Sequence, residues 1–281
     1  TERLFYLTAK TITRMTAEEA LALMEEQGLR LRSVTLTAKD KICFQEETIC
    51  QPEYCEFADG YYDRVNEAMV DILRNETRMT RNVIEAYARK HRVCPFEFSL
   101  DLAYIVDVVI GDYNYIFDPR VSLKRMVQED RKETALLIDE AHNLVERSRE
   151  MFSAELSGGP FYDLQELYHG GELAEAIEYV SAAFDYLIKD HRGDDSFILE
   201  EVPGMIEEAV EHFTTKAELE LREEPERHEN DLLLETYFAA QNFLKVLQLV
   251  DGHYVIYGMI EKNDLLLRLF CVDPSYLLRE V

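Results

Sequence analysis

Two adjacent carboxylates, Asp139 and Glu140, directly follow an apolar run at residues 136–138. An apolar strand that ends on two acids can carry them to the carboxyl edge of a parallel sheet, where open α/β sheets bind their ligands. In a nucleoside triphosphatase, the first of these carboxylates holds Mg²⁺ and the second orients the attacking water. The alternative is a strand followed by a helix whose first turn is acidic, because acidic residues there favour the helix dipole.

A second candidate site is a group of four cysteines in the first third of the chain. Their spacing is C-x6-C-x4-C-x38-C, at Cys43, Cys50, Cys55 and Cys94. Four loosely spaced thiolates suit the ligand set of a [4Fe–4S] cluster. A zinc site, which favours Cys-x2-Cys pairs, and incidental buried thiols remain alternatives. We interpret the fifth cysteine, Cys271, as a buried core thiol at the end of an apolar strand.

The hydrophobic pattern indicates elements that could position these residues. A helix is expected at residues 17–27, with Thr16 as its N-cap and Gly28 as its stop. Strands are expected at residues 4–8, 31–36, 106–111 and 135–138. Alternating strands and helices predict a parallel sheet.

The remaining segments are expected to be mainly helical. Residues 62–91 show helical periodicity with a break near 75–80, and residues 161–250 look helical throughout. Two apolar runs at residues 254–259 and 265–272 flank a polar turn, which predicts a β-hairpin.

The charge of the chain is strongly negative and unevenly distributed. The 281 residues carry 30 Lys+Arg against 56 Asp+Glu, a formal net charge of −26. Residues 1–155 hold 21 bases and 29 acids, and residues 156–281 hold the other 9 bases and 27 acids. This charge argues against binding of nucleic acid through bulk charge, so any contacts with nucleic acid must be local. The N-terminus lacks a signal-peptide pattern and no apolar run is long enough for a membrane helix, so we expect a cytoplasmic protein without membrane contact.

Several stretches together resemble one family. LLIDEAHN at residues 136–143 is similar to the DEAH box of superfamily 2 helicases. With the inserted cysteines, the chain resembles the XPD/DinG-like iron–sulfur DNA helicases. The matching stretches, in family order, are FYLTAKTITR (5–14), KICF (41–44), CQPEYCEFADGYYDR (50–64), HRVCPFEFSLDLA (91–103), DVVIGDYNYIFDP (107–119) and LLIDEAHNLVERSREMFSAEL (136–156). The similarity fades afterwards and returns weakly at LRLFCVDPSYLL (267–278).

The resemblance implies an α/β fold: a partial RecA-like parallel sheet with an inserted cysteine-rich iron–sulfur domain and a mainly helical Arch domain. Motor domain 1 would occupy residues 1–40 and 96–156, around an iron–sulfur domain at residues 41–95. The Arch would occupy residues 157–265, and residues 266–281 would form an exit strand toward motor domain 2.

The resemblance also implies roles for individual residues. The cluster ligands would be Cys43, Cys50, Cys55 and Cys94. Asp139 would bind Mg²⁺–ATP, Glu140 would activate water, and His142 would couple hydrolysis to the nucleic-acid site. Thr8, Lys10, Thr11, Tyr113 and Tyr115 would lie along the path of single-stranded DNA. The expected activity is ATP-dependent 5′→3′ unwinding of forked DNA in repair or replication.

The chain departs from the family pattern in one respect. It has no G-x-x-x-x-G-K-[ST] phosphate-binding loop. The family carries that loop before residue 1 and its second motor domain after residue 281, so we expect an excised piece that is inactive alone. An iron–sulfur nuclease and a non-enzymatic, cluster-containing DNA-binding module are the alternative functions.

A basic stretch beside the cysteines is a candidate DNA-binding surface. Arg74, Arg78, Arg81, Arg89 and Arg92 fall roughly on one helical face. Such a face could follow a phosphate backbone, with nearby aromatic residues stacking on bases. The alternative is a solvated face paired with neighbouring acids. The acidic run at residues 218–229 is interpreted as solvated, with a DNA-repelling wall or a partner surface as the alternative.

Overall fold

The computed structural model describes residues 3–46, 48, 50–52, 54–120, 133–223, 230–262 and 264–279. Contacts within the chain divide it into two compact units, here called the N-terminal unit, up to Leu144, and the C-terminal unit, from Val145. The division falls earlier in the chain than the boundary that the sequence predicted after residue 156. None of the helices in the described ranges is long and apolar enough to span a membrane.

The N-terminal unit is built on a parallel sheet of five strands in the order β3-β2-β4-β1-β5. The strands are β1 (Arg3–Leu7), β2 (Ser33–Thr35), β3 (Arg78–Met79), β4 (Val108–Gly111) and β5 (Thr134–Ile138). All four strand pairings are parallel. The predicted α/β fold class with a parallel sheet is therefore confirmed. Strand β4 is buried throughout, whereas β5 at the sheet edge is only partly buried.

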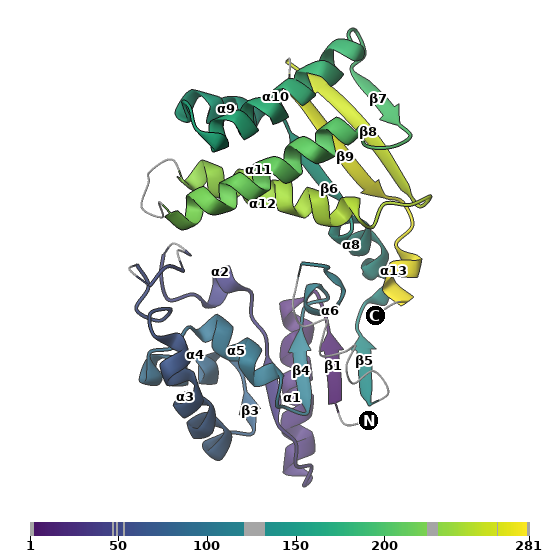
Figure 1. The fold of residues 1–281 in the computed structure, drawn as a ribbon. Helices are drawn as coiled ribbons and strands as arrows, with labels where there is room; N and C mark the ends of the chain where they lie inside the picture. Colours follow the sequence, from purple (N-terminus) through teal and green to yellow (C-terminus); the bar gives the residue numbers. More distant parts are fainter. Residues whose placement is uncertain are drawn as a thin grey trace. The chain divides into compact units, whose positions relative to one another are not determined.

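The helices of this unit are α1 (Thr11–Glu26), α2 (Lys39–Ile42), α3 (Tyr61–Asn75), α4 (Arg81–His91), α5 (Pro95–Ala103) and α6 (Asn114–Phe117). Helix α1 contacts β4 (Figure 1). It begins at Thr11, so the predicted start at residue 17 was wrong. The hydroxyl of Thr16 donates to the carbonyl of Ile12 at 3.2 Å and therefore lies inside the helix. Threonine can make this bond within a helix as readily as it caps one, which the sequence pattern did not distinguish.

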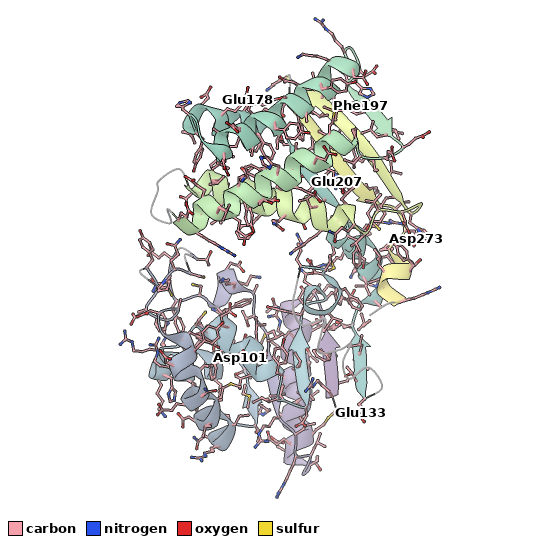
Figure 2. The ribbon with its side chains drawn as sticks, viewed as in Figure 1. Asp101, Glu133, Glu178, Phe197, Glu207 and Asp273 are labelled. Carbon is pink, nitrogen blue, oxygen red and sulfur yellow. The ribbon has the colours of Figure 1, made fainter. Side chains whose placement is uncertain are left out.

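The cysteine-rich segment contains the two predicted helices, α3 and α4, broken at the expected place. The break contains β3, which extends the parallel sheet beside β2. Helix α3 buries Val65, Ala68 and Ile72, and helix α4 buries Ile84 and Ala88. The hydroxyl of Tyr61 donates to Asp101 on α5 at 2.7 Å, which ties this segment to α5 (Asp101 is labelled in Figure 2).

The C-terminal unit packs helices on one face of a four-stranded antiparallel sheet in the order β6-β9-β8-β7 (Figure 1). The strands are β6 (Ala154–Ser157), β7 (Ser196–Leu199), β8 (Tyr254–Glu261) and β9 (Asp264–Cys271). Four helices, α9 (Gly159–Leu167), α10 (Glu172–Asp190), α11 (Gly204–Glu223) and α12 (Asn230–Leu247), share its core. Two others complete the fold, α8 (Leu144–Met151), which begins at the division, and α13 (Ser275–Arg279). The acidic run at residues 218–229 lies partly outside the described residues.

The predicted β-hairpin is confirmed as β8 and β9, which pair from Tyr254–Cys271 to Glu261–Asp264. The expectation that residues 161–250 are helical throughout was wrong, because β7 lies within them. The ring of Phe197 on β7 stacks on His191 with 3.6 Å between ring centroids. The same ring packs against the backbone of Gly258 on β8. This contact joins residues far apart in the sequence, so local periodicity could not reveal it.

We predict that Gly258→Ala destabilises the C-terminal unit, because a Cβ at this position would overlap the ring of Phe197. Overpacking of this kind costs about 1–3 kcal/mol. Thermal unfolding followed by circular dichroism would show a lower midpoint. The matched control is Gly204→Ala, because a Cβ at Gly204 meets no atom within 4 Å. Equal midpoints for the two variants would contradict the proposed packing role of Gly258.

Candidate functional site

The candidate site lies at the carboxyl edge of the parallel sheet, where β1, β4 and β5 end. Residue Thr8 follows β1, Asp112 and Tyr113 follow β4, and Asp139 and Glu140 follow β5. The backbone N–H of Asp139 donates to the carbonyl of Leu7 at 2.9 Å, so the β1–β5 pairing continues to the site itself. Residues from three distant parts of the chain are thereby brought together.

The carboxylate of Asp139 accepts a hydrogen bond from Thr8. The side chain of Thr8 is fully buried, and its hydroxyl donates to Asp139 Oδ2 at 3.3 Å. The same hydroxyl is hydrogen-bonded to that of Thr13 on α1. Thr8 was predicted to touch DNA, but its side chain lies in the interior and orients Asp139. The rotamer of this carboxylate is already restricted, so binding a divalent cation would cost it little further conformational entropy.

Glu140 is held on three sides. Its Oε1 accepts from Lys10 Nζ at 2.8 Å, and its Oε2 lies 3.3 Å from Asn143 Nδ2 and 3.4 Å from His142 Nε2. The hydrogen bond from Lys10, followed by the attraction of its charge, holds the pKa of Glu140 below its ordinary value. A glutamate with an ordinary pKa is already ionised at neutral pH, so the main effect of the Lys10 contact there is to hold the carboxylate in place.

The backbone at Glu140 adopts an unusual conformation. Its φ is 51°, in the left-handed region that non-glycine residues seldom occupy. The hydroxyl of Tyr113 donates to the carbonyls of Asp139 and Glu140, and these hydrogen bonds restrain the turn. Left-handed non-glycine residues concentrate at functional sites, where surrounding contacts maintain them. This turn directs the two adjacent carboxylates to different partners.

The predicted DNA-contacting residues divide by exposure. Tyr113 is fully buried, and burial raises the pKa of the half-buried Tyr115 to about 12. Lys10 and Thr11 are exposed at the start of α1, although Lys10 is paired with Glu140. Lys10 and Thr11 are thus the accessible members of this group, whereas Tyr113 supports the turn at Asp139 and Glu140.

The four predicted metal ligands are free thiols in the N-terminal unit. Cys43 occupies the C-cap position of α2 and Cys94 the N-cap position of α5, while Cys50 and Cys55 lie between α2 and α3. In the described part of the chain, no three His, Cys, Asp or Glu side chains come together as a metal-binding group. The predicted ligand set therefore remains a prediction.

The surroundings of Cys94 affect the pKa of its thiol in opposite directions. Burial raises the pKa of this thiol, and backbone N–H groups of Glu97 and Phe96 directed at its sulfur act in the opposite direction. Amide donors of this kind stabilise cluster sulfurs and thiolates in iron–sulfur proteins.

Lys39 is a further residue of this region that the sequence analysis did not single out. Partial burial would by itself lower its pKa, but a hydrogen bond with Cys50 and the attraction of Cys50, Glu97 and Cys94 raise it overall. Its ammonium group also lies 5.6 Å from the ring centroid of Phe96. A cation between two candidate ligands offsets thiolate charge. In the sequence, the signal for this role is the position of Lys39 four residues before Cys43, at the start of α2.

The five arginines beside the cysteines do not share one helical face. They lie at the end of α3 (Arg74), on β3 (Arg78), on α4 (Arg81 and Arg89) and at its left-handed C-cap (Arg92). The prediction of a single face was wrong because β3 interrupts the helical period between α3 and α4.

Several of these arginines are paired within the N-terminal unit. Arg78 Nε lies 2.9 Å from Glu25, and Arg81 Nε lies 2.6 Å from Glu85. Arg74 is exposed at the end of α3. Neighbouring carboxylates thus compete with any phosphate for Arg78 and Arg81. The alternative interpretation, solvated arginines paired with neighbouring acids, therefore fits Arg78 and Arg81.

Comparisons with known proteins found similar sequences and structures. The DEAD_2 family model matches residues 8–159, more than half of the chain. A regulator of telomere elongation helicase 1 homolog of Drosophila mojavensis is 21% identical over 258 residues, covering 85% of this chain and 24% of the relative. The human regulator of telomere elongation helicase 1 is 24% identical over 145 residues, covering 48% of this chain and 12% of that protein. The chain thus spans about a quarter or less of the length of these relatives.

Solved structures show the same fold. A structure described as truncated XPD has a TM-score of 0.57 and 18% identity, with 99% of this chain and 77% of that chain covered. A second, described as an XPD helicase, has a TM-score of 0.56 and 17% identity, with 99% and 48% covered. At these identities the similarity concerns the fold.

We predict that Lys10→Ala raises the pKa of Glu140 toward its ordinary value, because the Lys10 contact is the main cause of its depression. A carboxyl carbon NMR titration would measure this shift. The stabilisation from a depressed carboxyl pKa is present above the unfolded value and is lost as the pH falls through the folded value. The variant should lose this pH-dependent contribution. Lys262→Ala is the control, and equal Glu140 midpoints in all three proteins would contradict the assignment.

Proposed function

Because the chain belongs to the DEAD_2 family of XPD/DinG-like superfamily 2 helicases, we propose that it is part of a motor that couples ATP hydrolysis to 5′→3′ movement on single-stranded DNA and to strand separation. The observation that carries this proposal is the pair Asp139 and Glu140, held by Thr8 and Lys10 at the carboxyl edge of the sheet. Unwinding during DNA repair or replication is the proposed setting.

In this proposal, Asp139 binds the Mg²⁺ that accompanies ATP, and Glu140 orients and polarises the attacking water. Thr8 restricts the rotamer of Asp139. Lys10 pairs with Glu140, lowers the pKa of its carboxyl group and restricts its position. His142, exposed beside Glu140, would transmit the state of the nucleotide to the DNA site. The sequence has no phosphate-binding loop with a Gly-Lys-Ser/Thr ending, so these residues alone do not cradle the phosphates.

The proposed DNA contacts are local, since the chain as a whole is acidic. Lys10 and Thr11 are accessible at the carboxyl edge, and Arg74, Arg78 and Arg81 are candidates beside the cysteine region. A phosphate that approaches Arg78 or Arg81 must displace Glu25 or Glu85. Single-stranded and forked DNA remain the proposed ligands, with a second motor domain elsewhere in a longer protein.

We also propose that Cys43, Cys50, Cys55 and Cys94 hold a [4Fe–4S] cluster, which would brace the cysteine-rich domain. Four thiolates bind such a cluster, and hydrogen bonds to the sulfurs and nearby charges tune it. The amides of Phe96 and Glu97 at Cys94, and the ammonium group of Lys39, offer the last two. The C-terminal unit would correspond to the Arch, whose acidity would keep DNA away from its surface.

Glu140→Gln is predicted to reduce DNA-stimulated ATP hydrolysis by the full-length protein roughly 10²- to 10⁴-fold, the range typical of a lost general base. Binding of Mg²⁺–ATP should persist, because Asp139 is unchanged. A steady-state phosphate-release assay with and without single-stranded DNA measures this. The control is Glu19→Gln, an exposed acid on α1.

Full turnover by the Glu140→Gln variant would refute the role assigned to Glu140. DNA-stimulated hydrolysis by residues 1–281 alone would refute the expectation that this piece is inactive. ATP-independent cleavage of DNA would instead favour the iron–sulfur nuclease.

Lys39→Ala is predicted to reduce the iron and sulfide retained per chain and to accelerate bleaching of the visible thiolate-to-iron absorption. The physical reason is the loss of a positive charge beside Cys50 and Cys94. Lys39→Arg should retain the cluster. Lys41→Ala, on the same short helix, is the matched control. Retention in Lys39→Ala equal to that of the control would show that Lys39 has no such role, and zinc in place of iron would refute the cluster itself.

A further inference from the structure

A surface hollow lies on the N-terminal unit at the amino ends of its strands, away from the candidate site. It has two adjoining parts that share Gly28 and Leu29, with volumes of about 740 and 510 Å³. The first part lies along the end of α1 (purple in Figure 1), and the second reaches Asp107, which precedes β4, and Thr77, which precedes β3. An occupant here would not compete with ligands at the opposite, carboxyl edge.

The first part of the hollow is apolar. Its lining includes Leu23, Met24 and Leu29, which are 62%, 49% and 42% exposed. Helix α1 has no buried residue along its described length. Gly28 has a φ of +96°, and a Cβ built on it would meet no atom within 4 Å, so the chain turns away here without filling the space. Contiguous exposed apolar side chains of this kind mark interaction sites.

The second part contributes two arginines, Arg30 and Arg32, beside two acids. Glu25 is paired with Arg78 at 2.9 Å, whereas Asp107 accepts from the backbone N–H of Arg32 at 2.6 Å and keeps its negative charge. The two arginines therefore exceed the unpaired acid by one positive charge. Within the described residues, the guanidinium of Arg32 donates to the carbonyl of Leu73, at 3.4 Å. Exposed Arg30 makes no ion pair with any residue that the structure describes. The hollow therefore offers two arginines in a chain whose net charge is −26.

We propose that this hollow docks an amphipathic, acidic segment of a partner protein. Apolar side chains of that segment fill the space beside Leu23, Met24 and Leu29, and its carboxylates pair with Arg30 and Arg32. Arginine is well suited to this task, because its planar guanidinium binds a carboxylate through two parallel hydrogen bonds. A nucleic acid fits less well, because the lining is largely apolar and Glu25 and Asp107 form part of its wall. The proposal is independent of the function proposed for the carboxyl edge.

The test uses residues 1–281 and two fluorescein-labelled synthetic peptides of one amphipathic pattern, one built from Leu and Glu and the other from Leu and Lys. Fluorescence anisotropy should show saturable binding of the Leu/Glu peptide alone. Arg30→Glu should weaken that binding about tenfold or more, which corresponds to a difference of 1.4 kcal/mol. Leu23→Ser should weaken it as well through the apolar part. Arg192→Glu, at an exposed arginine of the C-terminal unit, is the charge-matched control and should bind as the parent does.

The side chains of Arg30, Leu23 and Arg192 are all exposed, so circular dichroism should show unchanged folding of the three variants. Equal binding of the Leu/Glu and Leu/Lys peptides would overturn the proposal, as would binding unaffected by Arg30→Glu. Sedimentation velocity tests whether the hollow instead binds a second copy of the chain. Concentration-dependent self-association that Arg30→Glu abolishes, without binding of the Leu/Glu peptide, would assign the hollow to a second copy of the chain and refute the partner segment.

Discussion

The parallel pairing of β5 with β1 determines the geometry of the candidate site. Its register places Leu7 opposite Ile138, so Thr8 and Asp139 leave their strands at the same level. The hydrogen bond from the N–H of Asp139 to the carbonyl of Leu7 extends this pairing by one step. Side chains alternate between the faces of a sheet, so a slip of one residue would turn Asp139 away from Thr8. The contacts of both carboxylates follow from this register.

The interior of the N-terminal unit supports the same turn. Tyr113 is fully buried and directs its hydroxyl to the carbonyls of Asp139 and Glu140. Thr8 is equally buried and directs its hydroxyl to the carboxylate of Asp139. Two residues that resemble DNA-contacting positions therefore act from inside the fold. They restrain the turn at Glu140, whose left-handed backbone is seldom adopted without such restraint.

The acidic charge of the chain affects its few bases directly. Lys10, Arg78 and Arg81 each pair with a carboxylate of the same unit. These are exposed pairs, which contribute little to stability and are weakened by salt. Phosphates could replace the carboxylates by exchange, because each arginine would keep an anionic partner. A strongly negative net charge and local DNA binding are therefore compatible.

Elements with local signals could be predicted from the amino-acid sequence. The apolar runs at β1, β4 and β5, the hairpin of β8 and β9 and the two helices of the cysteine region all follow from periodicity over a few residues. The DEAH string also placed Asp139 and Glu140 at the end of a strand. These features depend on neighbours in the chain, so the sequence was sufficient for them.

The tertiary structure decided the features whose partners are distant. Strand β3 exists because it pairs with β2, and β7 because it pairs with β8 and because Phe197 packs on Gly258. The interior positions of Thr8 and Tyr113, and the approach of Lys39 to Cys50 and Cys94, likewise depend on segments that meet only in the fold. Hydrogen bonding and burial depend on which groups lie close in space, and residue order along the chain does not specify that proximity.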